Sequence, residues 1–140
     1  MAAFLKFQPF VEALAHKVHD LSADSLKVML TNTDPGSTSS ILTDITEIAA
    51  GNGYTAGGNG AAVVSSQQTD GTYRLVLNDP ATWTAAGGSI GPFQWAVLYN
   101  DTTVDKDLVG YWNYGSAVTL SDGESFSVDF DATTGVLTLV

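Results

Sequence analysis

The 140-residue sequence predicts a mainly β protein. We expect a single-domain β-sandwich or small barrel of about eight strands, with an N-terminal amphipathic helix and a second short helix. Three observations lead to this expectation. Apolar residues recur with helical spacing near the N-terminus, they alternate with polar residues along much of the rest, and short turns containing Gly, Asn and Asp separate the alternating segments.

One stripe of apolar residues indicates the N-terminal helix. Its members recur at steps of three and four residues: Phe4, Phe7, Val11, Leu14, Val18 and Leu21. Pro9 disrupts a helix interior because it lacks an N–H group, but it fits the first turn. We therefore predict a helix over about residues 9–20, preceded by an N-terminal arm, residues 1–8. Residues 9–140 form the β-rich domain.

The second short helix is predicted over about residues 44–50. Asp44 is followed three residues later by Glu47, as in a capping box, and Gly51 suits the position just past a helix end. The next segment, residues 51–60, is rich in glycine and is expected to be an irregular loop.

The remaining chain reads as strands. Alternation of apolar and polar residues begins at Leu26, and Thr69-Asp70-Gly71 is a strong hairpin signal. The predicted strands are residues 26–30, 61–68, 72–78, 82–85, 93–100, 108–114, 117–120, 124–130 and 136–140. No internal repeat or interdomain linker interrupts them, so we expect one domain.

Charge and composition exclude several classes of protein. Fifteen acidic and five basic residues give a formal net charge of −10, so binding to nucleic acid or to an anionic membrane surface is not expected. The chain has no cysteine, which rules out disulfides and thiolate metal sites. After Lys27 the only cations are Arg74 and Lys106. We expect an acidic face that promotes solubility or meets a basic partner.

Candidate catalytic or metal sites are few. Glu12, His16 and His19 are spaced four and three residues apart on the predicted helix, on a face that can hold a metal ion or simply be solvated. The loop Asp101–Asp107 contains three aspartates, which offer oxygens to calcium or form a solvated loop. No serine-nucleophile elbow or glycosidase-like carboxylate pair is apparent. We therefore expect no enzymatic activity, no metal and no cofactor.

Aromatic residues crowd one part of the chain and are more informative. They are Trp83, Phe93, Trp95, Tyr99, Tyr111, Trp112 and Tyr114. Because strand residues alternate between two faces, some of these side chains must point away from a single core. Exposed Trp and Tyr side chains can stack on sugars or anchor a protein interface. Packing between two sheets and under the helix accounts for them equally well.

Six segments together carry a resemblance to a known group of proteins. They are residues 10–16 (FVEALAH), 26–35 (LKVMLTNTDP), 44–58 (DITEIAAGNGYTAGG), 83–93 (WTAAGGSIGPF), 96–101 (AVLYND) and 125–131 (SFSVDFD). These segments resemble a family of small structural proteins encoded with the virion genes of tailed bacteriophages. The resemblance spans nearly the whole chain. It implies a component of the virion, and because the first residues lack the features of a signal peptide, we expect synthesis in the host cytoplasm.

Within the virion we expect a capsid decoration (cement) protein that binds the outer surface of the assembled head and stabilises it. The expected partners are the major capsid protein or other virion proteins and further copies of this chain, arranged as a trimer. Phe4 and Phe7 are the candidate anchors of the arm, and Trp95, Tyr111 and Trp112 are the candidate subunit contacts. The alternatives are a tail, collar or fibre component, or a carbohydrate-binding β-sandwich that uses its exposed aromatic residues.

Overall fold

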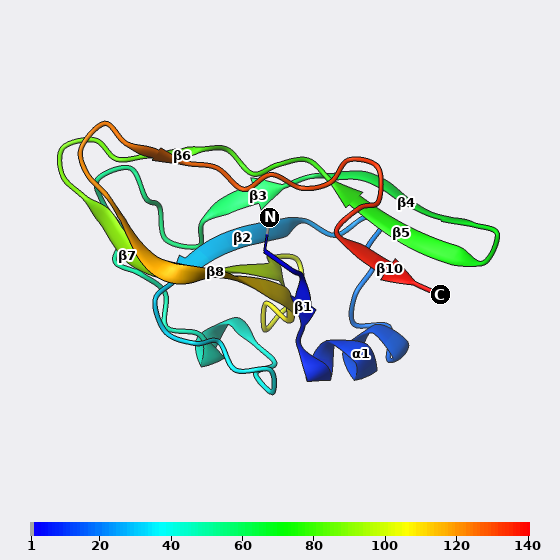
Figure 1. Cartoon of the computed structure of the whole chain (residues 1–140). Helices are drawn as coiled ribbons and strands as arrows, with labels where there is room; N and C mark the ends of the chain where they lie inside the picture. Colours follow the sequence, from blue (N-terminus) through cyan, green and yellow to red (C-terminus); the bar gives the residue numbers. More distant parts are fainter. Residues whose placement is uncertain (1) are drawn as a thin grey trace.

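The structure is a computed structural model that describes residues 2–140 (Figure 1). Within this range the chain forms ten strands, one α-helix and one 3₁₀ turn. The elements are β1 (Leu5–Lys6), α1 (Gln8–Ala15), β2 (Leu26–Thr31), η1 (Leu42–Asp44), β3 (Asn59–Ala61), β4 (Val63–Thr69), β5 (Thr72–Leu77), β6 (Trp83–Thr84), β7 (Ile90–Asn100), β8 (Leu108–Leu120), β9 (Ser125–Phe126) and β10 (Leu137–Leu139). The predicted mainly β class is confirmed.

The strands form three antiparallel sheets. The main sheet has the order β1-β8-β7-β2-β3, a second sheet has the order β10-β5-β4, and β6 pairs with β9. The layers resemble an open β-sandwich (Figure 1), and within residues 2–140 none of the sheets closes on itself. The sandwich alternative of the sequence prediction is therefore the better description. No helix in this range is long and apolar enough to cross a membrane.

The core covers both faces of the main sheet, because consecutive residues such as Val97 and Leu98 of β7 are buried and point to opposite sides. Leu30 of β2 lies opposite Ala96 of β7, which lies opposite Trp112 of β8, and all three residues are buried. Because facing residues in a sheet project to the same side, this row forms one continuous apolar surface. Phe130 covers the Trp112 ring at a centroid distance of 5.4 Å. Burial of each large side chain is worth about 1.5–3 kcal/mol.

Helix α1 is shorter than predicted. Pro9 lies in its first turn, as expected, but the helix ends at Ala15 and does not continue to residue 20. Lys17 adopts the left-handed conformation with φ 67°. Its N–H donates to the Leu14 carbonyl, and the Val18 N–H donates to the Ala13 carbonyl. This pair of hydrogen bonds is a Schellman motif, which ends the helix without the glycine that usually signals it.

The predicted helix over residues 44–50 is wrong. Only the single 3₁₀ turn η1 forms, and the chain then becomes extended, with Glu47 bridged to Thr31 at the end of β2. Asp44 does act as a cap, but its carboxylate accepts hydrogen bonds from the backbone N–H groups of Ser40 and Ile41, which precede the turn. The predicted capping box between Asp44 and Glu47 does not form, and the Asp44 carboxylate instead closes the turn that precedes it.

The predicted arm is part of the fold. Leu5 and Lys6 form β1, which extends the main sheet by pairing with Tyr111 and Gly110 of β8. The next residue, Phe7, is 0% exposed and its N–H donates to the Val109 carbonyl. Residues 5–7 are thus held by the chain's own sheet.

Candidate binding surfaces

A large bulge interrupts strand β8. Trp95 of β7 faces Asn113 of β8, and the next facing pair is Phe93 with Val118. Residues 114–117 of β8 therefore oppose Gln94 alone. A bulge re-aims the side chains that it carries, and such features are common next to functional sites.

The bulge is held by specific hydrogen bonds. The Asn113 Oδ1 atom accepts one bond from the Gly115 N–H at 2.8 Å and another from Gln94 Nε2 at 3.0 Å. Gly115 adopts φ 100°, a conformation that favours glycine. Within the bulge, Tyr114 remains 58% exposed, and its ring meets Phe126 edge-on at a centroid distance of 5.8 Å. The backbone thus presents one tyrosine at the surface in a fixed position.

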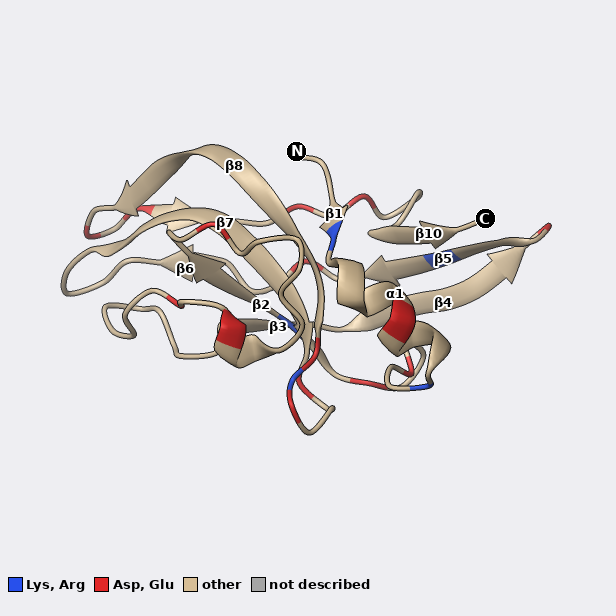
Figure 2. Ribbon diagram, turned by 90° about the horizontal axis from the view of Figure 1, so that it is seen from below, with Lys and Arg blue, Asp and Glu red and all other residues tan. Residues whose placement is uncertain are grey.

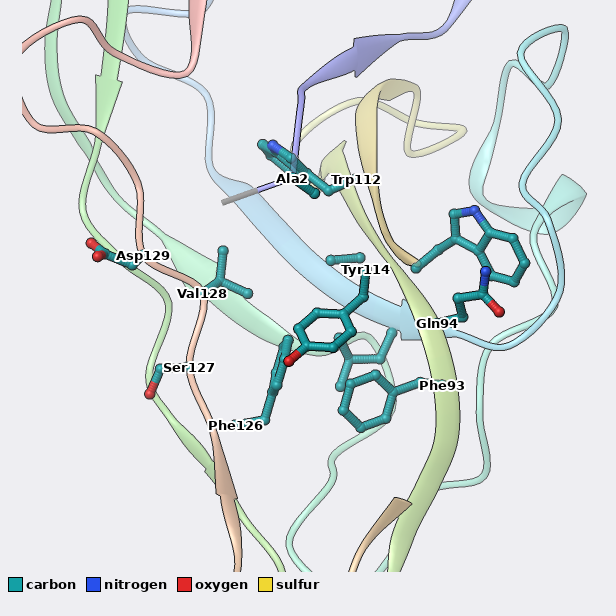
Figure 3. Close-up of a pocket in the computed structure, with 12 residues that line it drawn as sticks. Ala2, Phe93, Gln94, Trp112, Tyr114, Phe126, Ser127, Val128 and Asp129 are labelled. Atoms are coloured by element: carbon teal, nitrogen blue, oxygen red, sulfur yellow. The ribbon is translucent and has the colours of Figure 1, made fainter. Parts of the chain in front are cut away.

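Tyr114 stands at an apolar opening between the main sheet and the segment that contains β9, which we call the aromatic crevice. Its volume is about 260 Å³. The aromatic residues that line it are Phe93, Trp95, Trp112, Tyr114 and Phe126. Figure 3 shows Val128 pointing toward the tyrosine, while the side chains of Ser127 and Asp129 lie on the outer side of their segment. Asp129 is the one charged residue among those that line the crevice.

A second surface, on which aliphatic and polar side chains are mixed, lies near the two ends of the chain, and we call it the terminal face. Strands β1 and β10 are each the outermost strand of their sheet, and both lie beside α1 (Figures 1 and 2). A depression of about 510 Å³ between the two strands is lined by Leu5, Tyr111 and Thr138. A neighbouring depression joins Val18 to Leu139. The three aliphatic side chains of this face, Leu5, Val18 and Leu139, are 46%, 39% and 44% exposed.

The structure places four of the five interface candidates in contacts within the chain. Phe7 packs on Tyr111 at 4.8 Å and Phe4 packs on Trp112 at 5.3 Å between ring centroids. Phe7, Tyr111 and Trp112 are buried within their own chain, and Phe4 is half-buried. These four rings therefore fasten the arm to the main sheet. Trp95 is half-buried in the aromatic crevice and stays accessible.

The expected metal candidates do not come together. Glu12 and His16 form an exposed pair 3.8 Å apart, whereas His19 lies beyond the end of α1 and is buried. In the loop Asp101–Asp107, Asp101 forms an ion pair with Lys106 at 2.8 Å. No group of three potential metal-ligating residues occurs within residues 2–140.

The sequence did not predict the buried polar cluster around His19. Asn100 Nδ2 lies 3.0 Å from His19 Nδ1 and donates to Asp24 Oδ2 at 2.6 Å, and the Asn100 Oδ1 atom accepts from the Thr102 N–H. Since an amide nitrogen can only donate, His19 Nδ1 is an acceptor and the imidazole is neutral with its proton on Nε2. Burial lowers the pKa of His19, while the carboxylates of Asp107 and Asp24 act in the opposite direction. The Nε2 atom has no hydrogen-bond partner among the described residues.

The glycine-rich loop is also held by a network that the sequence did not reveal. The Glu47 carboxylate accepts hydrogen bonds from the Tyr54 hydroxyl and the Gly57 N–H, each at 2.7 Å. Tyr54 in turn accepts from the Leu30 N–H, and Tyr99 donates to the Gly57 carbonyl at 2.6 Å. Burial is the main cause that raises the pKa values of both tyrosines. These bonds hold the predicted loop against the main sheet.

Comparison with known proteins adds no identification. No family model, no curated protein and no solved structure matches this chain.

Proposed function

We propose that this chain is a non-enzymatic structural protein of a tailed-bacteriophage virion, and specifically a capsid decoration protein that binds the outside of the assembled head. Its partners are the major capsid protein and further copies of the chain, in a trimer. The terminal face is the observation that carries this proposal, together with the resemblance of the sequence to small virion proteins.

The terminal face has the properties of an assembly surface. It brings together two strand edges, β1 and β10, whose outer sides have no neighbouring strand in the described part of the chain. Unpaired strand edges are ready sites for pairing with another chain. The exposed side chains of Leu5, Val18 and Leu139 add apolar area beside these edges, and exposed apolar side chains among polar groups are typical of protein contacts.

The first test is the copy number of the protein in purified particles, measured by quantitative mass spectrometry against the major capsid protein. A decoration protein that covers a symmetric shell is expected at about one copy per capsid subunit. A ratio of only a few copies per hundred would overturn the decoration role in favour of a tail, collar or fibre component. Absence from particles would overturn the virion role altogether.

The second test asks whether the terminal face makes the contact. Leu5→Asp and Leu139→Asp each place a charge among exposed aliphatic side chains, so we expect binding to undecorated heads to weaken at least about tenfold, or about 1.4 kcal/mol. Co-sedimentation of purified protein with heads measures this binding. Val64→Asp is the control, since Val64 is also an exposed aliphatic residue and lines neither depression of the face. Equal binding by all three variants would contradict the assignment of this face.

A further inference from the structure

We propose that the aromatic crevice is a binding site for a neutral pyranose sugar, with Tyr114 as its stacking platform. This activity is additional to the proposed role in the particle and does not depend on it. The inference rests on three properties of the crevice: how Tyr114 is held, which polar groups surround it, and which charges are absent from its lining.

Tyr114 is a prepared platform rather than an incidental exposed residue. The bulge at residues 114–117 lifts it out of the ladder, and Asn113 fixes the bulge through its hydrogen bond to the Gly115 N–H. The Phe126 ring braces the tyrosine from the side at 5.8 Å. A fixed aromatic side chain loses little conformational entropy on binding, so it contributes contact area at low cost. The C–H face of a pyranose ring is apolar and nearly flat, so it can stack on the ring of Tyr114.

One amide side chain for sugar hydroxyls, that of Gln94, lines the crevice. Its Nε2 atom donates to Asn113 Oδ1. Its Oε1 acceptor has no hydrogen-bond partner among the described residues, so this acceptor remains free for a ligand. Binding sites of this type combine apolar walls with a few polar groups that set orientation.

Charge selects among saccharides. No lysine or arginine lines the crevice, and Asp129 is on its rim. The chain also lacks any cation after Lys106, while residues 107–140 contain five acids. Carboxylated, sulfated or phosphorylated sugars would therefore meet repulsion without a compensating cation. An uncharged pyranose satisfies the apolar and polar features without that penalty.

A strand from another protein is a poorer occupant. Addition of a strand requires a regular edge with evenly spaced donors and acceptors, and the bulge breaks the register of β8 beside the crevice. Bulges are a device by which proteins protect sheet edges from such pairing. This end of β8 therefore differs from the regular edge that β1 occupies.

Saturation-transfer difference NMR tests the proposal with the full chain and four probes: the methyl glycosides of glucose, galactose, mannose and N-acetylglucosamine. We expect transfer to at least one glycoside, strongest at its ring C–H protons, and a response of tryptophan fluorescence in the same titration because Trp95 lines the site. Because the ligand is neutral, raising the salt concentration should leave the affinity unchanged.

Variants decide whether the signal comes from the crevice. Tyr114→Ala should weaken binding at least about tenfold, Tyr114→Phe should retain it, and Val64→Ala on β4 serves as the matched exposed control. Absence of transfer to all four glycosides with the wild-type chain would overturn the proposal, as would unchanged affinity of Tyr114→Ala. The copy number in particles is independent of these results, so failure here leaves the virion role standing.

Discussion

The terminal face is made by segments from the two ends of the chain, whereas the aromatic crevice is made largely around one bulge in the longest strand. Leu5 of β1 and Leu139 of β10 lie 134 residues apart in sequence. Folding brings their two strands to the same depression. Tyr114, Asn113 and Gly115 are neighbours in sequence and organise the crevice locally. The first surface therefore depends on the tertiary fold, and the second depends mainly on β8.

The two surfaces also differ in what fixes their side chains. The terminal face offers aliphatic groups, which make contacts with little directional preference, and backbone edges, which can pair with another strand whatever its side chains. The crevice offers a tyrosine whose position is set by a chain of hydrogen bonds through Asn113 to Gln94. Directional polar groups are what discriminates between small ligands. The difference explains why we assign assembly to one surface and ligand recognition to the other.

The largest expected effect concerns the arm that builds half of the terminal face. Phe7→Ala removes a side chain that is 0% exposed and packs on Tyr111, so we expect a loss of about 3–5 kcal/mol in the free energy of unfolding. Chemical denaturation monitored by tryptophan fluorescence measures this loss. Leu5→Ala, at a residue that is nearly half exposed, is the control and should change stability by less than about 0.5 kcal/mol.

A small change of stability in Phe7→Ala would show that the arm is only loosely attached. The β1 edge would then not be a fixed part of the terminal face, and the face would not depend on the tertiary fold in the way that we describe. The truncation of residues 1–8 is a less informative variant, because it removes Phe7 from the core together with the exposed residues that we assign to head binding.

A smaller perturbation separates the two surfaces more cleanly. A Cβ atom on Gly110 would overlap the Phe4 ring and crowd the Leu5 carbonyl, so Gly110→Ala should push β1 off the edge of β8 at a cost of about 1–3 kcal/mol. We expect faster proteolysis near Lys6 and weaker binding to heads, with a smaller effect on glycoside binding because Ala2 is the one described residue of the arm that lines the crevice. The control is Gly60→Ala, because the added Cβ would lie 4.0 Å from the nearest carbonyl oxygen and Gly60 does not have a positive φ. Gly71→Ala is unsuitable as a control because Gly71 has φ 83°.

If Gly110→Ala weakened both activities equally, the two surfaces would be coupled through β8. Ala2 lines one end of the crevice, so the arm does touch both regions. The measurement therefore also reports how far the influence of the arm extends along that strand.

The sequence predicted those parts of the fold whose signals are local and periodic. Strands β2, β5 and β7 were found because apolar residues alternate along them, and the β4–β5 hairpin was found because its turn contains Asp70 and Gly71. Helix α1 was overextended because Val18 continues the apolar spacing, while the left-handed Lys17 that ends the helix has no distinctive sequence signal. Glu47 was misread because a carboxylate three residues after Asp44 suits a cap, yet its partners lie in the following loop.

The surfaces were harder to predict than the strands. Several residues of the aromatic cluster line the aromatic crevice. Alternation alone could not predict that Trp112 is buried and Tyr114 exposed, since they lie two residues apart on the same strand. The bulge interrupts the regular alternation of β8 after Asn113, and Gly115 is its only sign in the sequence. The terminal face could not be foreseen, because pairing of β1 with β8 and of β10 with β5 joins segments that share no local pattern.

The smallest expected effect is a pH dependence of the folding stability, which arises from His19 at the terminal face. His19 is 6% exposed and lines the depression that holds Val18 and Leu139. Its folded-state pKa lies below the ordinary value of 6.5 because of burial, against the opposing influence of Asp107 and Asp24. As the pH falls below about 6.5, the unfolded chain binds a proton more readily than the folded chain, so stability decreases. The decrease continues until the pH passes the lowered folded-state pKa.

Protonation also breaks a specific contact, because an N–H on His19 Nδ1 would face the amide nitrogen of Asn100. One proton limits the slope to about 1.4 kcal/mol per pH unit. Denaturation between pH 7 and pH 5 should reveal the slope, and His19→Gln should reduce it. The exposed carboxyls of Asp20, Asp44 and Asp131 have pKa values lowered from 3.8, so their contribution is lost only at more acidic pH. An identical slope in His19→Gln would place the pH sensitivity elsewhere and remove it from the terminal face.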